Sequence, residues 1–142
     1  MNTTYPHETM GKTLLLCDEG DERRRVYARR RNQLLEVGEF SWGTSTLVGY
    51  GAPAHVHCVH LERHGQQGCA ASLTRLGYGE RKVEELLEQY FAKEKGLLTD
   101  FMDDLDAWGV PYGYLNVDVG SHVSYRPARR PRPVVPPSQS GA

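Results

Sequence analysis

The residue types best suited to chemistry gather in one stretch of the chain, residues 49–68. This stretch contains four of the six histidines with a cysteine and a glutamate between them: His55, His57, His60, His64, Cys58 and Glu62. Imidazole nitrogens, thiolates and carboxylates are the side-chain groups that bind divalent metals such as zinc. If the protein has a chemical site, the sequence predicts it here.

A strand is expected over residues 54–63, and it decides which of these side chains lie together. Successive side chains of a strand point to opposite faces of a sheet. His55 and His57 are therefore expected on one face, and Cys58 and His60 on the other. Two imidazoles at alternate positions lie about 6–7 Å apart along a strand, close enough to hold one ion.

The first metal hypothesis uses the face that carries His55 and His57. A bulge or turn after the strand is needed to bring Glu62 round to this face as a third ligand, and His122 is a candidate fourth. The ion would be one divalent metal, with zinc, iron, manganese and nickel all compatible with these ligands.

Two other interpretations of the stretch remain open. Cys58 and His60 offer a soft and a borderline ligand, a combination that suits zinc. Alternatively, His55, His57 and His64 are surface or hydrogen-bonded histidines on a half-exposed strand and bind nothing.

The spacing of this stretch also resembles the first metal-binding signature of the cupins. Gly49 is followed after five residues by His55-x-His57, then after four residues by Glu62, and then by Gly68. The resemblance implies a small β-barrel that holds a divalent metal with two histidines, a glutamate and a later histidine. The chain departs from the family because Gly68 comes one residue early and the second signature is echoed only by Pro111-x-Gly113.

Charge is the second feature that predicts function, since a net charge of −1 hides a strong segregation. Basic residues crowd the segment 23–31, which contains Arg23, Arg24, Arg25, Arg29, Arg30 and Arg31 around Tyr27. Guanidinium groups bind phosphate through paired hydrogen bonds, and an aromatic ring among them can stack on a base. This block predicts contact with a nucleic acid or nucleotide, unless it forms a solvated strand edge or pairs with an acidic neighbour.

Acidic residues crowd the segment 80–106 and include Asp100, Asp103 and Asp104. An acidic face of this kind can occupy a basic groove on another macromolecule. Together, the basic and acidic segments favour a charged partner, with a protein as the first expectation and nucleic acid as the second.

The elements that would position these residues are first a series of short strands. An apolar run at 12–18 precedes a turn, and residues 22–33 are either the second strand of a hairpin or a helix, with the hairpin favoured. Segments 34–41, 44–50 and 54–63 are short, β-branched and separated by glycines. With a loop at 64–68, they predict an antiparallel β-meander over residues 12–76.

The second half of the chain changes period. Apolar residues in 79–95 recur at intervals of three and four, which is typical of an amphipathic helix, and a second such helix begins at Thr99 or Asp100 and ends near Gly109. Segments 112–119 and 122–125 alternate as a final pair of strands. The predicted fold class is therefore α+β, with two helices packed on an antiparallel sheet and a strand pair at 112–125.

The ends of the chain are expected to lie outside the fold. Residues 1–11 are a polar lead-in, residues 1–125 are one domain, and the basic, proline-rich segment 126–142 is a disordered tail. The three cysteines are odd in number and lack metal or redox spacing, and no apolar run is long enough to span a membrane. We expect no membrane partner and a cytoplasmic location.

The sequence thus predicts a small, non-enzymatic interaction or regulatory protein that binds a macromolecular partner through its charged faces. Such a protein could be an inhibitor carried by a mobile element. The alternative is a metal-dependent enzyme or sensor built on His55, His57 and Glu62.

Overall fold

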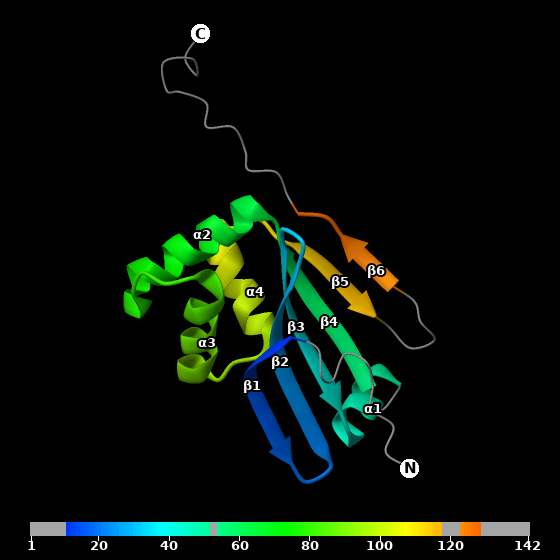
Figure 1. Ribbon diagram of the computed structural model, residues 1–142. Helices are drawn as coiled ribbons and strands as arrows, with labels where there is room; N and C mark the ends of the chain where they lie inside the picture. The colour runs from blue at the N-terminus through cyan, green and yellow to red at the C-terminus, as the bar shows by residue number, and fades with distance from the viewer. Residues whose placement is uncertain (1–10, 52–53, 118–122, 129–142) are drawn as a thin grey trace, which may run out of the picture.

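The structure is a computed structural model that describes residues 11–51, 54–117 and 123–128. Among these residues, the centre of the fold is an antiparallel sheet of six strands in chain order (Figure 1), which confirms the predicted meander and the α+β class. The strands are β1 (Lys12–Glu19), β2 (Glu22–Arg31), β3 (Leu34–Trp42), β4 (Ala54–Leu61), β5 (Gly113–Val117) and β6 (Val123–Arg126). The predictions for residues 1–10, for His122 and for the tail beyond residue 128 lie outside the described residues.

The sequence left residues 22–33 between strand and helix, and residues 22–31 form the second strand of a hairpin. β1 and β2 pair antiparallel, and the turn between them contains Gly20 with φ 64°. Glycine has no Cβ to clash in this left-handed conformation, which a tight reversal requires. The hairpin places the arginines of β2 alternately on the two faces of the sheet.

In the described part of the chain, four α-helices accompany the sheet: α1 (Thr44–Tyr50), α2 (Arg63–Leu73), α3 (Val83–Glu94) and α4 (Leu98–Ala107), with a π-helical turn, η2 (Thr74–Tyr78), after α2. Figure 1 shows α2, α3 and α4 gathered on one side of the sheet, whereas α1 lies apart from them, between the end of β3 and the start of β4. We call the side that α2, α3 and α4 cover the helix face. None of the described helices has the length and apolar character needed to cross a membrane.

The helix face carries the hydrophobic core. The strands contribute buried aliphatic side chains that include Val26, Ala28, Leu35, Val37, Val59 and Leu61. The helices contribute buried side chains that include Leu73, Leu86, Leu87, Phe91, Leu98, Phe101 and Leu105. The predicted helices at 79–95 and 99–108 are confirmed as α3 and α4, because their apolar residues recur at the period of a helix and meet the sheet. Asp100 accepts a hydrogen bond from the Leu97 amide at 2.8 Å, so α4 begins at Leu98, slightly earlier than predicted.

The prediction of a strand at 44–50 is wrong, because this segment is helix α1. The helix follows Gly43 and ends at Gly51, whose left-handed conformation lets its amide donate to the Leu47 carbonyl. β-branched residues favour strands, but here the chain must reverse between two adjacent antiparallel strands. A short helix makes this reversal, so β4 pairs directly with β3.

The prediction of a loop at 64–68 is also wrong, because residues 63–73 form α2. Its buried residues are Gly65, Cys69, Ser72 and Leu73, which follow the period of a helix that the glycines had obscured. Gly65 is needed there because a Cβ would lie 2.6 Å from the Pro111 carbonyl oxygen. The glycines therefore allow close packing in this helix and do not mark a turn.

Candidate functional site

The alternation predicted for β4 decides where its histidines lie. His55 and His57 share the helix face with Val59 and Leu61, and Cys58 and His60 point to the opposite face of the sheet. β3 runs beside β4 in a register that pairs Glu36 with His60 and Glu39 with His57. Each face of the strand pair therefore combines histidine with a glutamate from β3.

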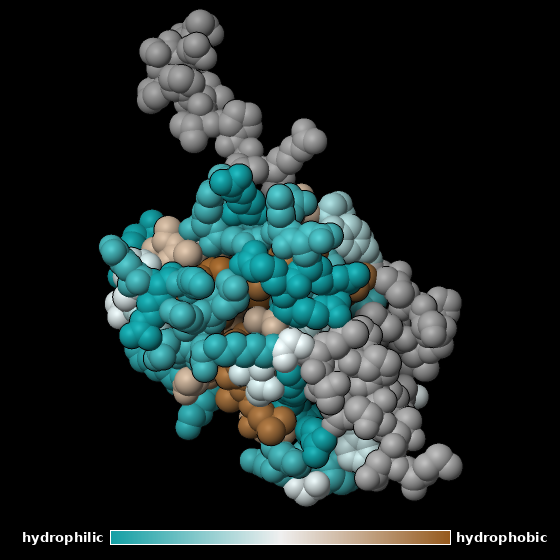
Figure 2. Space-filling model, viewed as in Figure 1, coloured by the Kyte–Doolittle hydropathy of each residue, from teal (hydrophilic) through white to brown (hydrophobic). Residues whose placement is uncertain are grey.

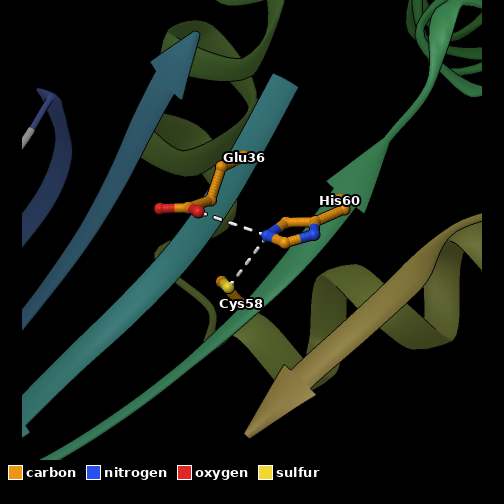
Figure 3. Close-up of side chains that lie close together, drawn as sticks. All are labelled: Glu36, Cys58 and His60. Atoms are coloured by element: carbon orange, nitrogen blue, oxygen red, sulfur yellow. Dashed lines mark hydrogen bonds and ion pairs between the residues drawn. The ribbon is translucent and has the colours of Figure 1, made fainter. Parts of the chain in front are cut away.

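Three potential metal ligands converge on the face opposite the helices (Figure 3). His60 Nε2 lies 3.4 Å from Cys58 Sγ and 3.2 Å from Glu36 Oε1. All three ligand atoms lie within 4.8 Å of one another, and this is the one such group among the described residues. We call it the Glu36–Cys58–His60 cluster. Cys58 and Glu36 are buried and His60 is largely buried, so the cluster lies in the body of the sheet.

Glu36 is held in place through its second carboxylate oxygen. The Tyr27 hydroxyl donates to Glu36 Oε2 at 3.1 Å, and Arg29 Nε lies 3.5 Å from the same oxygen. These contacts leave Oε1 facing His60, with Arg31 Nη1 4.0 Å away from it. Fixing a ligand by outer partners in this way is common in metal sites.

Gly38 makes the Tyr27 contact geometrically feasible. In the sheet, Gly38 pairs with Tyr27 on β2 and with Cys58 on β4. A Cβ at Gly38 would lie 2.4 Å from the Tyr27 hydroxyl oxygen, so any side chain there would displace the ring. Glycine thus lets a fully buried tyrosine lie across β3 and reach Glu36.

The electrostatics of the cluster separate the carboxylate from the thiol. Burial alone would raise the pKa of Glu36, but hydrogen bonds from His60 and Tyr27 and the charge of Arg29 together bring it below its usual value. Burial, with a contribution from the Glu36 charge, raises the pKa of Cys58 to about 12. Glu36 is therefore ionised at neutral pH, and the thiol keeps its proton unless a metal displaces it.

This geometry does not fit a cysteine nucleophile. A reactive cysteine needs a lowered pKa, whereas burial raises the pKa of Cys58. A catalytic triad also uses both nitrogens of the histidine, one toward the nucleophile and one toward the acid. In this cluster a single nitrogen, His60 Nε2, faces both Cys58 and Glu36.

Two separations in the cluster match those between ligands of a tetrahedral zinc ion. Bond lengths of about 2.0–2.3 Å from zinc to nitrogen, oxygen and sulfur place neighbouring ligand atoms about 3.3–3.6 Å apart in a tetrahedron. The observed separations from His60 Nε2 are 3.4 Å to sulfur and 3.2 Å to oxygen. The third separation, from Cys58 Sγ to Glu36 Oε1, is within 4.8 Å.

On the helix face, His55 and His57 have different surroundings. His57 uses both ring nitrogens, with Nδ1 2.9 Å from the Tyr114 hydroxyl and Nε2 3.4 Å from Glu39 Oε1. His55 Nε2 lies 2.6 Å from Asn116 Oδ1. The two rings therefore bond to different partners. This agrees with the interpretation of His55 and His57 as hydrogen-bonded histidines.

Glu39 links this group to the helices. The Leu98 amide, at the start of α4, donates to Glu39 Oε2 at 2.9 Å, and Arg24 Nε lies 3.6 Å from Oε1. Burial would raise the pKa of Glu39, but hydrogen bonds from His57 and Leu98 lower it. The group therefore joins the sheet to α4, which is a structural role.

The other predicted ligands lie elsewhere. Glu62 follows the end of β4 and is the residue before α2, so the length of strand between it and His57 is about 16 Å. It is exposed, as is His64 in the first turn of α2. His122 lies outside the described residues. The structure thus brings His55 and His57 together but keeps Glu62 away from them.

The arginines predicted to bind a partner make contacts inside the chain. Arg23 pairs with Asp18, Arg24 with Glu39, Arg29 and Arg31 with Glu36, and Arg30 with Glu84, while Arg25 bonds to Thr13 and to the Gly11 carbonyl. Tyr27 is fully buried, so its ring has no exposed face for a base. Most of these contacts are ion pairs with acidic neighbours, as in the alternative interpretation of the arginine block.

The predicted acidic residues are divided in the same way. Asp100 accepts a hydrogen bond from the Leu97 amide, and Asp104 accepts one from the Tyr90 hydroxyl. Asp103 is exposed on α4. Glu84 and Glu88 of α3 pair with Arg30 of β2 and Lys12 of β1, so α3 and the hairpin neutralise each other.

Glu36 is a candidate ligand that was not predicted from the sequence. The signal was a pair of carboxylates, Glu36 and Glu39, within the otherwise uncharged run LLEVGEF. Glu36 meets His60 only because β3 pairs directly with β4. The strand predicted at 44–50 would have separated β3 from β4. No protein-family model matches this chain, and neither a curated protein nor a solved structure matches it. Its function is therefore argued from its own residues.

Proposed function

We propose that the protein binds one zinc ion in the Glu36–Cys58–His60 cluster. The observation that carries this proposal is the convergence of a thiol, an imidazole nitrogen and a carboxylate oxygen within 4.8 Å. A cysteine and a histidine select zinc over magnesium or calcium, which prefer oxygen ligands alone.

The number of ligands indicates the type of site. Three protein ligands leave the fourth tetrahedral position for water or a bound molecule, as in catalytic zinc sites, whereas structural sites use four. Zinc lowers the pKa of a bound water toward neutrality, so the site could activate water or polarise a bound oxyanion. The metal-dependent alternative from the sequence is thus carried forward, with ligands different from those first expected.

The outer contacts also support a metal site. Tyr27 and Arg29 hold Glu36 Oε2, which orients Oε1 toward His60. The ligands come from adjacent strands of one sheet, which is a rigid support. Such a site needs little reorganisation when the ion binds.

Metal content and zinc titration test the proposal. The full-length chain, purified without a histidine tag, should contain close to one equivalent of zinc by elemental analysis, and after a chelator it should take up one equivalent in a calorimetric titration. Cobalt in the same site should show the absorption of a thiolate bound to tetrahedral cobalt. In Cys58→Ser this absorption should disappear.

Cys17→Ser is the matched control, because Cys17 is an exposed cysteine on β1. This variant should keep the zinc affinity and the cobalt spectrum of the original protein. A protein that takes up no zinc, or that binds it equally well in Cys58→Ser, would refute the proposal.

The interaction protein expected from the sequence stays a prediction. Most of its predicted contact residues already have partners within the chain, and Asp103 is an exposed exception. Binding through charged faces should weaken steeply with salt, whereas zinc binding in a buried cluster should not.

A further inference from the structure

A pocket lies at the end of the sheet where β3 begins, and one of its lining residues, Arg31, also contacts Glu36 of the cluster. Its volume is about 750 Å³. The lining comes from the β2–β3 turn and the start of α2, with Arg31, Leu34, Glu62, Arg63 and His64 as the residues relevant to binding. Figure 1 shows this turn beside the first residues of α2, and Figure 2 shows hydrophilic side chains over the same region.

The walls of the pocket are tied together. The Gln66 side-chain amide donates to the Gln33 carbonyl at 2.7 Å and to the Leu61 carbonyl at 2.8 Å. The Gln66 side-chain oxygen Oε1 accepts from Arg30 Nη1 at 3.0 Å, and Arg30 also pairs with Glu84 of α3. These bonds fix the β2–β3 turn against the end of β4 and the start of α2, so the pocket is formed before anything binds.

Basic side chains dominate the lining. Arg31 and Arg63 carry permanent charges, against a single carboxylate from Glu62. Guanidinium groups bind phosphate and carboxylate through paired, charge-assisted hydrogen bonds. Leu34 adds an apolar surface, and the volume is within the range of about 300–1,000 Å³ that is typical of small-molecule sites.

Arg31 connects the pocket with the cluster. It lines the pocket, and its Nη1 lies 4.0 Å from Glu36 Oε1, the oxygen that faces His60. A zinc ion bound to Glu36 Oε1 would neutralise the carboxylate that Arg31 now contacts. The guanidinium would then be available to an anion in the pocket.

We infer that the pocket binds a small organic anion, with a phosphate or carboxylate group on Arg31 and an apolar body near Leu34, and that zinc strengthens this binding. The inference rests on the proposed zinc site. Thiolate and carboxylate ligands neutralise the ion, so Arg31 gives the loaded site a positive charge that an anion compensates. By thermodynamic linkage, the anion strengthens zinc binding by the same factor.

Calorimetric titration of the full chain with phenyl phosphate tests the inference, with benzoate as the carboxylate probe and benzyl alcohol as the neutral control. Each titration uses zinc-loaded protein and chelator-treated protein, with zinc content measured before and after. We expect zinc to raise the affinity for either anion by about fivefold or more. Benzyl alcohol should bind more weakly and without dependence on zinc.

Arg31→Gln should lower the affinity of the zinc-loaded protein for phenyl phosphate by about tenfold. Arg23→Gln is the matched control, because it removes a similarly exposed arginine from the other end of β2. Failure to bind zinc would refute the proposed function and the coupling together. A protein that binds zinc, but binds phenyl phosphate equally with and without it or after Arg31→Gln, would refute this inference alone.

Discussion

The two faces of β4 carry the same kinds of side chain in opposite arrangements. On the helix face, His57 places its two nitrogens on Tyr114 and Glu39, and each nitrogen has its own partner. On the opposite face, one nitrogen of His60 faces both Cys58 and Glu36. In the first arrangement each ring nitrogen has its own partner, and in the second one nitrogen shares two partners.

This difference separates a structural histidine from a candidate ligand. A histidine with separate partners for its nitrogens is satisfied as it stands, and an ion would have to break those hydrogen bonds. In the cluster, by contrast, an ion bound by the three ligand atoms would replace the two contacts that one nitrogen now shares. Convergence of ligand atoms, more than the number of histidines in a stretch, identifies the candidate site.

Replacing one histidine on each face of β4 should separate the two roles most clearly. His60→Ala deletes the convergence point, so zinc affinity should fall by more than about a hundredfold, since even outer-contact losses cost roughly ten- to a hundredfold. His57→Ala should keep zinc affinity within about threefold, because His57 does not touch the cluster. It should instead lower the free energy of unfolding by about 2 kcal/mol, because buried Glu39 loses a partner.

Calorimetric zinc titration and urea unfolding measure the two effects on the same pair of proteins. If His57→Ala lost zinc and His60→Ala kept it, the assignment of the two faces would be reversed.

The contacts behind Glu36 should have the next largest effect. Tyr27→Phe removes the hydrogen bond to Glu36 Oε2 and keeps the ring, so zinc affinity should fall about tenfold. Gly38→Ala should weaken zinc further, because its methyl group would displace Tyr27. Tyr125→Phe is the control, since the exposed Tyr125 contacts the His60 ring but holds no ligand in place.

Zinc titration of these variants, with circular dichroism to check folding, provides the measurement. Equal affinity in Tyr27→Phe and the original protein would show that Glu36 needs no outer support.

The helix face should show its structural role through pH. Hydrogen bonds hold the pKa of Glu39 below its usual value near 4.5, although burial opposes this. A carboxyl group with a lowered pKa in the folded state stabilises the protein above its unfolded pKa, and that stability is lost as pH falls through the folded pKa. The free energy of unfolding should therefore fall as pH drops from about 5 to about 3, and Glu39→Gln should show a smaller fall.

The pKa of Glu36 is lowered as well, so Glu36 also contributes to the pH dependence of stability. The difference between the original protein and Glu39→Gln isolates the contribution of Glu39. Parallel curves for the two proteins would mean that Glu39 gains nothing from its partners.

Much of the fold could be predicted because its signals are local. The hairpin of β1 and β2 depended on an apolar run, a glycine turn and alternation, and α3 and α4 depended on a helical period. The helices at 44–50 and 63–73 could not be predicted from local signals. In the first, the chain reversal overrode β-branched propensity, and in the second, glycines that serve packing resembled turn signals.

The candidate site was half predictable for the same reason. Strand alternation put Cys58 and His60 on one face, which needs only local sequence. Glu36 joins them through strand pairing, and an extra strand at 44–50 would have moved it away from β4. Four arginines of the block likewise have partners on β3 or α3, and no local pattern indicates them.

X-ray absorption spectroscopy of the zinc-loaded protein tests the central claim most directly, because it counts sulfur ligands. The cluster predicts one sulfur at about 2.3 Å and the remaining ligands as nitrogen or oxygen at about 2.0–2.2 Å, with the sulfur lost in Cys58→Ser. A zinc ion without any sulfur ligand would place the metal on another set of residues, such as His55 and His57, and would contradict the account.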